Sequence, residues 1–126
     1  MSPLLLVAVA AAGGIGAAAR FVVDGLVKDR LGAAYPWGTT VINVSGSFAL
    51  GLVTGLALQA VVAPEWKAVL GTGLLGGYTT FSTASIETVR LLHDGRSRAG
   101  LANALGMLVA SVVAALVGYG LGSLLA

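Results

Sequence analysis

The sequence predicts an all-α membrane protein with four transmembrane helices, the third of which is broken. Of its 126 residues, 57% are hydrophobic and 10% are charged, whereas an ordinary soluble domain carries about 25% charged residues. A bilayer crossing takes about 20 residues of helix. Four uncharged runs approach or exceed that length: Met1–Ala19, Leu31–Pro64, Ala68–Ile86 and Ala99–Ala126. We expect one domain over residues 1–126, with helices over roughly 3–27, 37–62, 67–91 and 99–124.

The middle of the first predicted helix, Ala10–Ala19, consists almost entirely of alanine and glycine. Such surfaces let helix backbones approach closely in lipid. The spacing Gly14-x-Gly16-x-x-Ala19 also matches a dinucleotide-binding turn, which requires a βαβ unit and an acidic residue about 20 positions further on. Asp24 comes too soon and no such unit follows, so nucleotide binding is not expected. No basic residue precedes the apolar run, so a secretory signal is not expected either.

Arg20 is the one basic residue that lies away from the ends of the predicted spans. Its long stem can carry the charge to the lipid headgroups, which would make it an interfacial anchor. Alternatively, it places a positive charge at an aqueous vestibule and attracts anions. A short polar loop follows and ends at Tyr35-Pro36-Trp37, where tyrosine and tryptophan favour the membrane interface.

The second and fourth predicted helices each carry a polar stripe and a close-packing motif. Residues four apart share a helix face. In the second helix that face holds Thr39, Asn43 and Ser47. In the fourth helix it holds Asn103, Met107, Ser111 and Ala115. The amide of Asn43 needs partners in hydrocarbon, and from the residues alone it either joins two helices or faces an ion. The close-packing motifs are Gly51-x-x-x-Gly55 and Gly118-x-x-x-Gly122.

The third segment is poorly suited to a continuous helix. Gly76 and Gly77 are adjacent at its middle, and hydroxyl residues are dense from Thr79 to Ser85. Each glycine costs about 1 kcal/mol of helix propensity relative to alanine. Non-helical backbone at membrane depth survives only where protein buries it or water lines it. We therefore expect a break near Gly76, with the freed backbone groups turned towards an ion, as in many transport sites.

The predicted spans lack the residues that an enzyme would need. Away from their ends they hold no carboxylate, lysine or metal-ligand cluster, and the chain has no cysteine. His93, just outside the third span, has no ligand partner nearby and is expected at the interface. A small dual-topology cation or drug exporter is the alternative, but it would need an acidic residue near the membrane centre. Asp24 and Glu87 both fall near span ends, which argues against this alternative.

The spans instead offer neutral hydrogen-bond donors and an aromatic ring edge. The side-chain donors are Thr39, Asn43, Ser82, Thr83 and Ser111. The ring edge of Phe81 is electropositive. Donors without fixed charge suit a small, strongly hydrated anion that loses its water in stages and is bound loosely enough to leave.

The segment Gly76-Gly-Tyr-Thr-Thr-Phe-Ser-Thr-Ala-Ser85 closely resembles the signature of the Fluc (CrcB-type) fluoride channels. The resemblance extends over nearly the whole chain. It includes Gly13-Gly-Ile-Gly with Arg20, Trp37-Gly-Thr with Asn43 and Gly46, and Gly95-Arg96 with Asn103 and Ser111. These motifs are specific in combination rather than singly.

This resemblance implies a passive, fluoride-selective channel that exports fluoride across a bacterial plasma membrane and confers fluoride resistance. It implies an antiparallel dimer of four-helix subunits with two pores, and a structural Na⁺ on the dimer axis. Carried over by position, the sodium-binding carbonyls belong to Gly76 and Thr79. The implied pore residues are Asn43, Phe81, Ser82, Thr83 and Ser111.

The chain departs from the family pattern at three positions. Ala84 stands where the family usually has a second phenylalanine. The family's fourth helix usually carries a longer row of polar side chains, and Met107 and Ala115 occupy two positions of that row here. These departures agree with a heterodimer in which one pore works while the other has decayed.

The distribution of the basic residues between the loops also indicates which kind of second subunit the chain needs. Six of seven lie on the side of the first and third loops, and Lys67 alone lies on the opposite side. Because basic loops stay cytoplasmic, the chain is expected to insert in one orientation, with both termini outside. It then needs an oppositely oriented sister subunit, unless a homodimer overrides the bias during assembly.

Overall fold

The computed structural model describes residues 1–125, and the regular structure of that part of the chain is helical. Short π-helical stretches, marked η, continue the helices on either side of them. In chain order the elements are α1 (Pro3–Leu31), α2 (Trp37–Leu58), α3 (Pro64–Lys67), η1 (Ala68–Leu75), α4 (Gly76–Tyr78), α5 (Phe81–His93), α6 (Ser97–Leu101), η2 (Ala102–Gly106) and α7 (Met107–Leu124).

Three helical stretches are long and apolar enough to cross a membrane: Pro3–Leu31, Trp37–Leu58 and Ser97–Leu124. The third predicted span, residues 67–91, is instead divided into two helical parts. Its first part, the α3–α4 rod, runs without interruption from Pro64 to Tyr78, and its second part, α5, has 13 residues. Each part by itself is shorter than the roughly 20 residues of helix that span a bilayer. The chain is therefore all-α with a broken third helix, as the sequence predicted.

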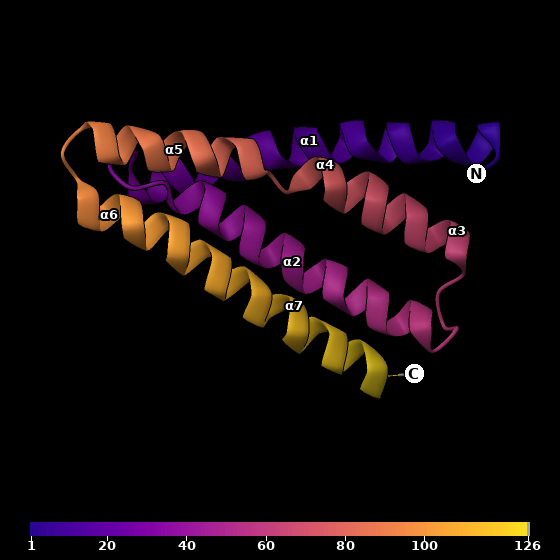
Figure 1. The fold of residues 1–126 in the computed structure, drawn as a ribbon. Coiled ribbons are helices and arrows are strands. Elements are labelled where there is room, and N and C mark those ends of the chain that lie inside the picture. The colour runs from indigo at the N-terminus through magenta and orange to yellow at the C-terminus, as the bar shows by residue number, and fades with distance from the viewer. Residues whose placement is uncertain (126) are drawn as a thin grey trace.

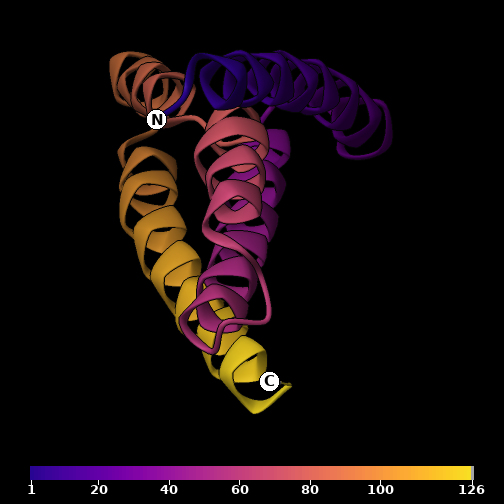
Figure 2. The same ribbon diagram turned by 90° about the vertical axis from the view of Figure 1, so that its right-hand side faces the viewer.

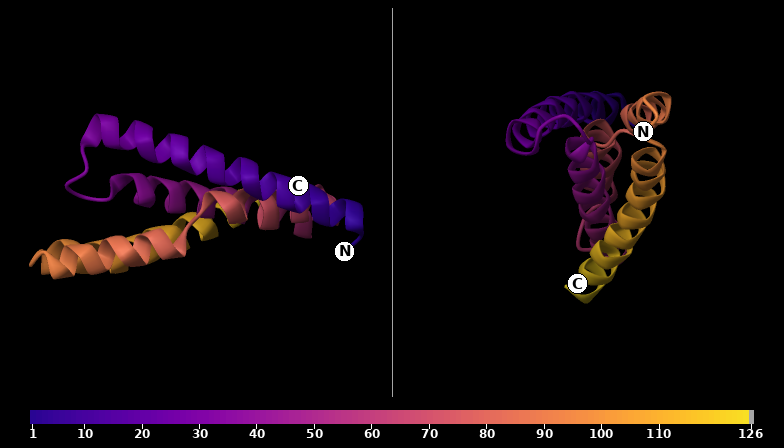
Figure 3. Two further views of the ribbon diagram at one scale, coloured as in Figure 1. Left: turned by 90° about the horizontal axis from the view of Figure 1, so that it is seen from above. Right: turned by 90° about the vertical axis from the view of Figure 1, so that its left-hand side faces the viewer.

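The helices form two packed groups (Figure 1). The α3–α4 rod lies along α1, and α2 lies along α7. The view from the side shows α2 and α7 extending away from the layer that holds α1 and α5 (Figure 2). Seen from above, α5 leaves the line of the α3–α4 rod at the break (Figure 3). The start of α1 and the end of α7 lie at the same end of the bundle, and the α5–α6 turn lies at the other (Figure 1).

Glycines bring α2 and α7 into backbone contact. A Cβ atom added to Gly51 would lie 2.1 Å from the carbonyl oxygen of Ala115, and one added to Gly118 would lie 2.1 Å from that of Phe48. Gly55 and Gly122 are enclosed in the same way, because a Cβ added to either would lie 2.5 Å from a carbonyl oxygen of the other helix. The two Gly-x-x-x-Gly motifs are thus confirmed as packing faces, and they pack against each other.

A second set of small residues joins α1 to the α3–α4 rod. A Cβ on Gly16 would lie 2.0 Å from the carbonyl oxygen of Leu74, and one on Gly77 would lie 2.1 Å from that of Gly13. A Cβ on Gly73 would lie 2.8 Å from the carbonyl oxygen of Val9. The alanine- and glycine-rich middle of the first helix is therefore the surface on which the third segment rests.

The break lies at Thr79 and Thr80 rather than near Gly76. Gly76 has helical dihedrals (φ −62°, ψ −39°), whereas Thr79 and Thr80 are extended (ψ 158° and 123°). The glycine pair stays helical because Gly77 packs directly on the backbone of α1, as described above. The helix ends where hydroxyl side chains can bond to the freed backbone.

The other helix ends differ from the predicted boundaries by a few residues. Gly32 (φ +78°) ends α1 and donates its N–H to the carbonyl of Lys28, so this helix runs four residues past the predicted 27. The second helix ends at Leu58, because Ala60 takes a left-handed conformation (φ +60°). The last helix starts at Ser97 and ends at Leu124, and α5 ends at His93.

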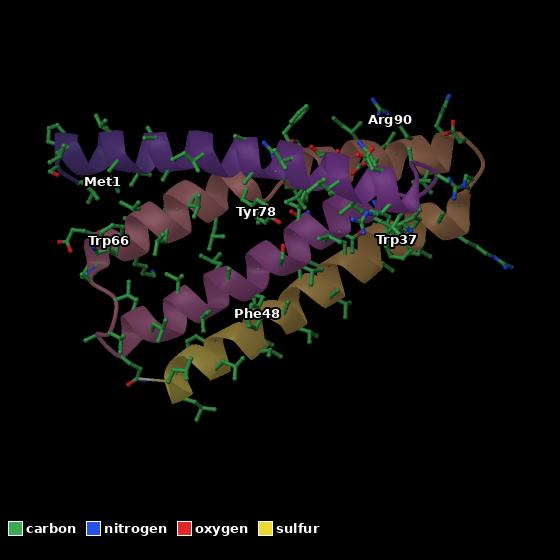
Figure 4. All side chains as sticks on the ribbon, turned by 180° about the vertical axis from the view of Figure 1, so that it is seen from behind. Met1, Trp37, Phe48, Trp66, Tyr78 and Arg90 are labelled. Atoms are coloured by element: carbon green, nitrogen blue, oxygen red, sulfur yellow. The ribbon has the colours of Figure 1, made fainter. Side chains whose placement is uncertain are left out.

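The two tryptophans mark opposite ends of the bundle. Trp37 and Arg90 lie at one end, and Trp66 and Met1 lie at the other (Figure 4). Both indole rings are exposed, at 46% and 61%. Tryptophan favours the membrane–water boundary, so this separation fits a bundle whose two ends lie at the two interfaces.

Candidate functional site

The side chain of Asn43 holds the broken backbone. Its Oδ1 accepts a hydrogen bond from the Thr80 N–H at 2.8 Å, and its Nδ2 donates to the Thr80 carbonyl at 2.8 Å. A break leaves backbone groups without helical partners, and an unpaired buried polar group is costly. Asn43 therefore replaces both missing bonds of Thr80 from the neighbouring helix.

Thr80 also caps α5. Its hydroxyl oxygen accepts from the Thr83 N–H at 3.1 Å and donates to the Thr83 hydroxyl at 3.1 Å. The Ser82 hydroxyl lies 3.4 Å away. Thr80 is buried and was not predicted as a site residue. The available signal was a threonine three positions before Thr83 at a helix start, which is an N-cap pattern.

A thioether lies against the same amide. The Asn43 Nδ2 also donates to the Sδ of Met107 at 3.1 Å, and Met107 is buried with 7% of its surface exposed. Ser111 follows one turn later on α7, and its buried Oγ has no hydrogen-bond partner within residues 1–125. The spacing of four residues placed Met107 on this stripe but did not indicate that it accepts a hydrogen bond.

The predicted site residues divide between an inner and an outer group. Asn43, Thr83 and Ser111 are part-buried within the subunit. Phe81, Ser82 and Gly76 are exposed, and the Phe81 ring is 88% exposed. Phe81 begins α5 directly after the break. A single subunit therefore brings together the amide and hydroxyl donors and leaves the aromatic ring on its surface.

Arg20 lines an open groove of about 360 Å³ between α1, α2 and the start of α5. Other lining residues include Asp24, Thr39, Thr80 and Thr83. Asp24 is paired with Lys28 (2.7 Å), and the Thr39 hydroxyl donates to a carboxylate oxygen of Glu87. One oxygen of each carboxylate thus has a partner, whereas the buried Oδ1 of Asp24 has none within residues 1–125. The groove connects the Arg20 charge with the hydroxyls at the break.

The carbonyls of Gly76 and Thr79, which the family resemblance implies as sodium ligands, lie at the C-terminal end of α4. Leu75 O accepts from both the N–H and the hydroxyl of Thr79, each at 2.9 Å. A helix leaves its last carbonyls without helical partners, and they carry partial negative charge. The carbonyls of Gly76 and Thr79 belong to this end. Within residues 1–125 no three His, Cys, Asp or Glu side chains are grouped so as to hold a metal ion.

These features define a multi-pass membrane protein with a broken helix, whose polar centre is built from neutral donors and backbone rather than from charge. Comparison with known proteins identifies the family. The sequence profile described as CrcB-like protein, Camphor Resistance (CrcB), matches residues 7–119, so the chain belongs to the CrcB family. The resemblance noted from its motifs is confirmed.

Bacterial relatives cover nearly the whole chain. A protein named fluoride-specific ion channel FluC 1 from Leifsonia xyli is 55% identical over 98% of this chain and 90% of its own length. FluC 2 from Cutibacterium acnes is 48% identical over 89% of this chain and 92% of its own. FluC from a strain of Thermus thermophilus is 40% identical over 93% and 94%. The family and the apolar helices place this chain in a bacterial plasma membrane as a multi-pass protein.

Proposed function

We propose that this protein is a fluoride-selective channel for passive fluoride export, which gives the cell fluoride resistance. The observation that carries the proposal is the 55% identity to a fluoride-specific ion channel over nearly the full length of both chains. The chemistry of the break agrees. Its donors are the amide of Asn43 and the hydroxyls of Thr83 and Ser111, which suit a small anion without trapping it by full charge.

The channel is passive and not an enzyme. A coupled exporter of organic cations would need an ionisable group near the membrane centre. Asp24, which lines the groove, is paired with Lys28, and Glu87 accepts a hydrogen bond from Thr39. Nothing at the break favours the exporter over the channel.

The conducting unit is an antiparallel dimer with two pores. The exposed Phe81 ring and Ser82, next to the inner donors, provide the surface that a second subunit would complete. In that assembly the fluoride path includes Asn43, Phe81, Ser82, Thr83 and Ser111, and lipid surrounds the outer helix faces. Arg20 attracts anions into the groove from the aqueous side.

A structural Na⁺ on the dimer axis is held by the carbonyls of Gly76 and Thr79. Oxygen ligands at a helix C-terminus suit a small cation, because the carbonyls there carry partial negative charge. Gly76 is exposed on the subunit, which leaves its backbone accessible to an ion shared with a partner. The ion would stabilise the break by compensating the ends of two helix dipoles.

The second subunit is either a sister protein inserted in the opposite orientation or a second copy of this chain. The strong asymmetry of basic residues favours the sister protein, since it holds this chain in one orientation. Ala84, Met107 and Ala115 agree with a heterodimer that keeps one working pore. A homodimer requires assembly to override the charge bias.

Fluoride efflux from liposomes tests the function. Vesicles loaded with potassium fluoride and containing the purified protein should release fluoride when valinomycin is added, and vesicles loaded with chloride should not release chloride at a comparable rate. The protein should be assayed alone and with any sister subunit encoded beside it. Equal release of chloride and fluoride from a conducting preparation would refute the proposal.

A further inference from the structure

We infer that Met107 is a positioning residue, whose sulfur holds the second amide hydrogen of Asn43 until fluoride takes its place. The inference rests on the proposed function, because it names the group with which the anion competes. Met107 is an apolar residue at a position of the fourth helix where the family usually has a polar side chain, and none of the sequence motifs accounts for its presence.

The orientation of the Asn43 amide is fixed by its partners. A backbone N–H can only donate and a backbone carbonyl can only accept. The Thr80 N–H therefore requires the amide oxygen, and the Thr80 carbonyl requires the amide nitrogen, each at 2.8 Å. The nitrogen must then lie on the side of Met107, because the amide cannot be turned over without losing both bonds.

The NH₂ group of Asn43 has two hydrogens, and both have acceptors. One is used by the Thr80 carbonyl, and the other points to the Met107 sulfur at 3.1 Å. The first bond is tied to the helix break and is expensive to lose. The second ends on a thioether, which is a weak acceptor. An anion would therefore take the second hydrogen at little cost and leave the break intact.

The surroundings provide a next partner for the anion. Ser111 lies one turn beyond Met107 on the same face of α7, and its buried hydroxyl oxygen has no hydrogen-bond partner among the residues described. An ion that displaces the sulfur from Asn43 meets a second neutral donor nearby. Met107 thus holds the second amide hydrogen of Asn43 in the absence of fluoride, and releases it when fluoride binds.

Two substitutions change the acceptor in opposite directions. Met107→Leu conserves volume and removes the acceptor, and Met107→Gln offers a stronger one. In liposome efflux, the fluoride concentration for half-maximal rate should fall at least threefold in Met107→Leu and rise at least threefold in Met107→Gln. A merely structural role would change the maximal rate and leave the half-saturating concentration constant. Half-saturation that stays constant or moves in the same direction in both variants would overturn the inference.

A direct measurement separates this inference from the proposed function. The chain has two asparagines and one glutamine, so the Asn43 side-chain amide can be assigned by ¹⁵N NMR using Asn103→Ala and Gln59→Ala. Its resonances should shift in Met107→Leu and on titration with sodium fluoride, but not with sodium chloride. If fluoride moves them while liposomes release no fluoride, the conduction proposal fails and the inference stands. If neither the substitution nor fluoride moves them, the inference is wrong whether or not liposomes conduct.

Discussion

Gly77 rests on the backbone of Gly13: a Cβ atom at position 77 would lie 2.1 Å from the Gly13 carbonyl oxygen. The contact fixes the α3–α4 rod against α1 just before the chain leaves its helical path at Thr79. The position of the break relative to the rest of the subunit therefore depends on a glycine that is itself helical.

Replacing Gly77 should disrupt the subunit. Gly77→Val places a branched side chain against backbone that cannot move aside, and overpacking of this kind costs about 1–3 kcal/mol or more. We expect loss of the folded protein in detergent, measured by size-exclusion chromatography and thermal unfolding. Gly14→Ala is the matched control, because nothing lies within 4 Å of its added Cβ. A fully stable, active Gly77→Val protein would contradict the observed packing.

Removing the Asn43 amide should release the break. Asn43→Leu has a similar size but leaves the N–H and carbonyl of Thr80 without their partners, at a cost on the order of 3 kcal/mol. Thermal unfolding in detergent should therefore shift to lower temperature, and fluoride efflux should be lost. Ser85→Ala provides the comparison, since the Ser85 hydroxyl bonds only to the carbonyl of Phe81 in its own helix. Equal stability of the two variants would argue against the role of Asn43 in the break.

Replacing Phe81 should abolish transport without unfolding the subunit. Its ring is 88% exposed, so Phe81→Leu removes little packing within one chain, while the proposed pore loses a ring edge. We expect normal expression and unfolding temperature, with fluoride efflux reduced at least tenfold. Phe48→Leu, on α2 and away from the break (Figure 4), should conduct normally. A Phe81→Leu protein that conducts at the normal rate would remove this residue from the pore.

The proposed sodium site depends on backbone and tolerates a conservative side-chain change. Thr79→Ser retains the hydroxyl that bonds to the Leu75 carbonyl, so its efflux should match the original protein. Replacing all sodium with N-methyl-D-glucamine during purification should abolish efflux, and added sodium should restore it. Efflux that survives complete sodium removal would show that the carbonyls of Gly76 and Thr79 hold no essential ion.

Orientation in the membrane can be measured because the chain has no cysteine. Ala63→Cys, in the exposed loop before α3, should react with an impermeant thiol reagent added to intact cells, and Ala33→Cys, in the loop after α1, should not. This result follows from the six basic residues on the side of the first and third loops. Labelling of both positions to the same extent would show dual insertion, and the case for a sister subunit would fall.

The sequence was sufficient to predict the helical class, the broken third helix and the family, because these depend on hydropathy and on a specific motif. It was insufficient for the location of the break. Adjacent glycines destabilise a helix unless a neighbouring element packs on them. The contact of Gly77 with Gly13 is such a packing contact, and it depends on tertiary structure that the local sequence does not reveal. Thr80 was missed for the same reason, since its two bonds come from Asn43, far away in the chain.

The site predictions show a similar division. The stripe of Asn43 and the stripe of Met107 and Ser111 were each visible from spacing of four residues. That the two stripes meet at one amide depends on how α2 lies against α7, and the spacing within one helix carries no information about this. The exposure of Phe81 likewise depends on how the whole subunit folds, so it could not be predicted from the local sequence.

The glycine contacts between α2 and α7 have a consequence for biosynthesis. They join a helix made early to the last helix made, so a nascent chain that has left the ribosome only as far as α5 has α2 inserted without its principal neighbour. Gly51 and Gly55 are then not covered by α7. The subunit closes only after synthesis of α7 brings Gly118 and Gly122 into place. Nascent chains truncated before residue 107 should therefore be susceptible to membrane proteases. Folding of each subunit is completed only when the last helix has been synthesised.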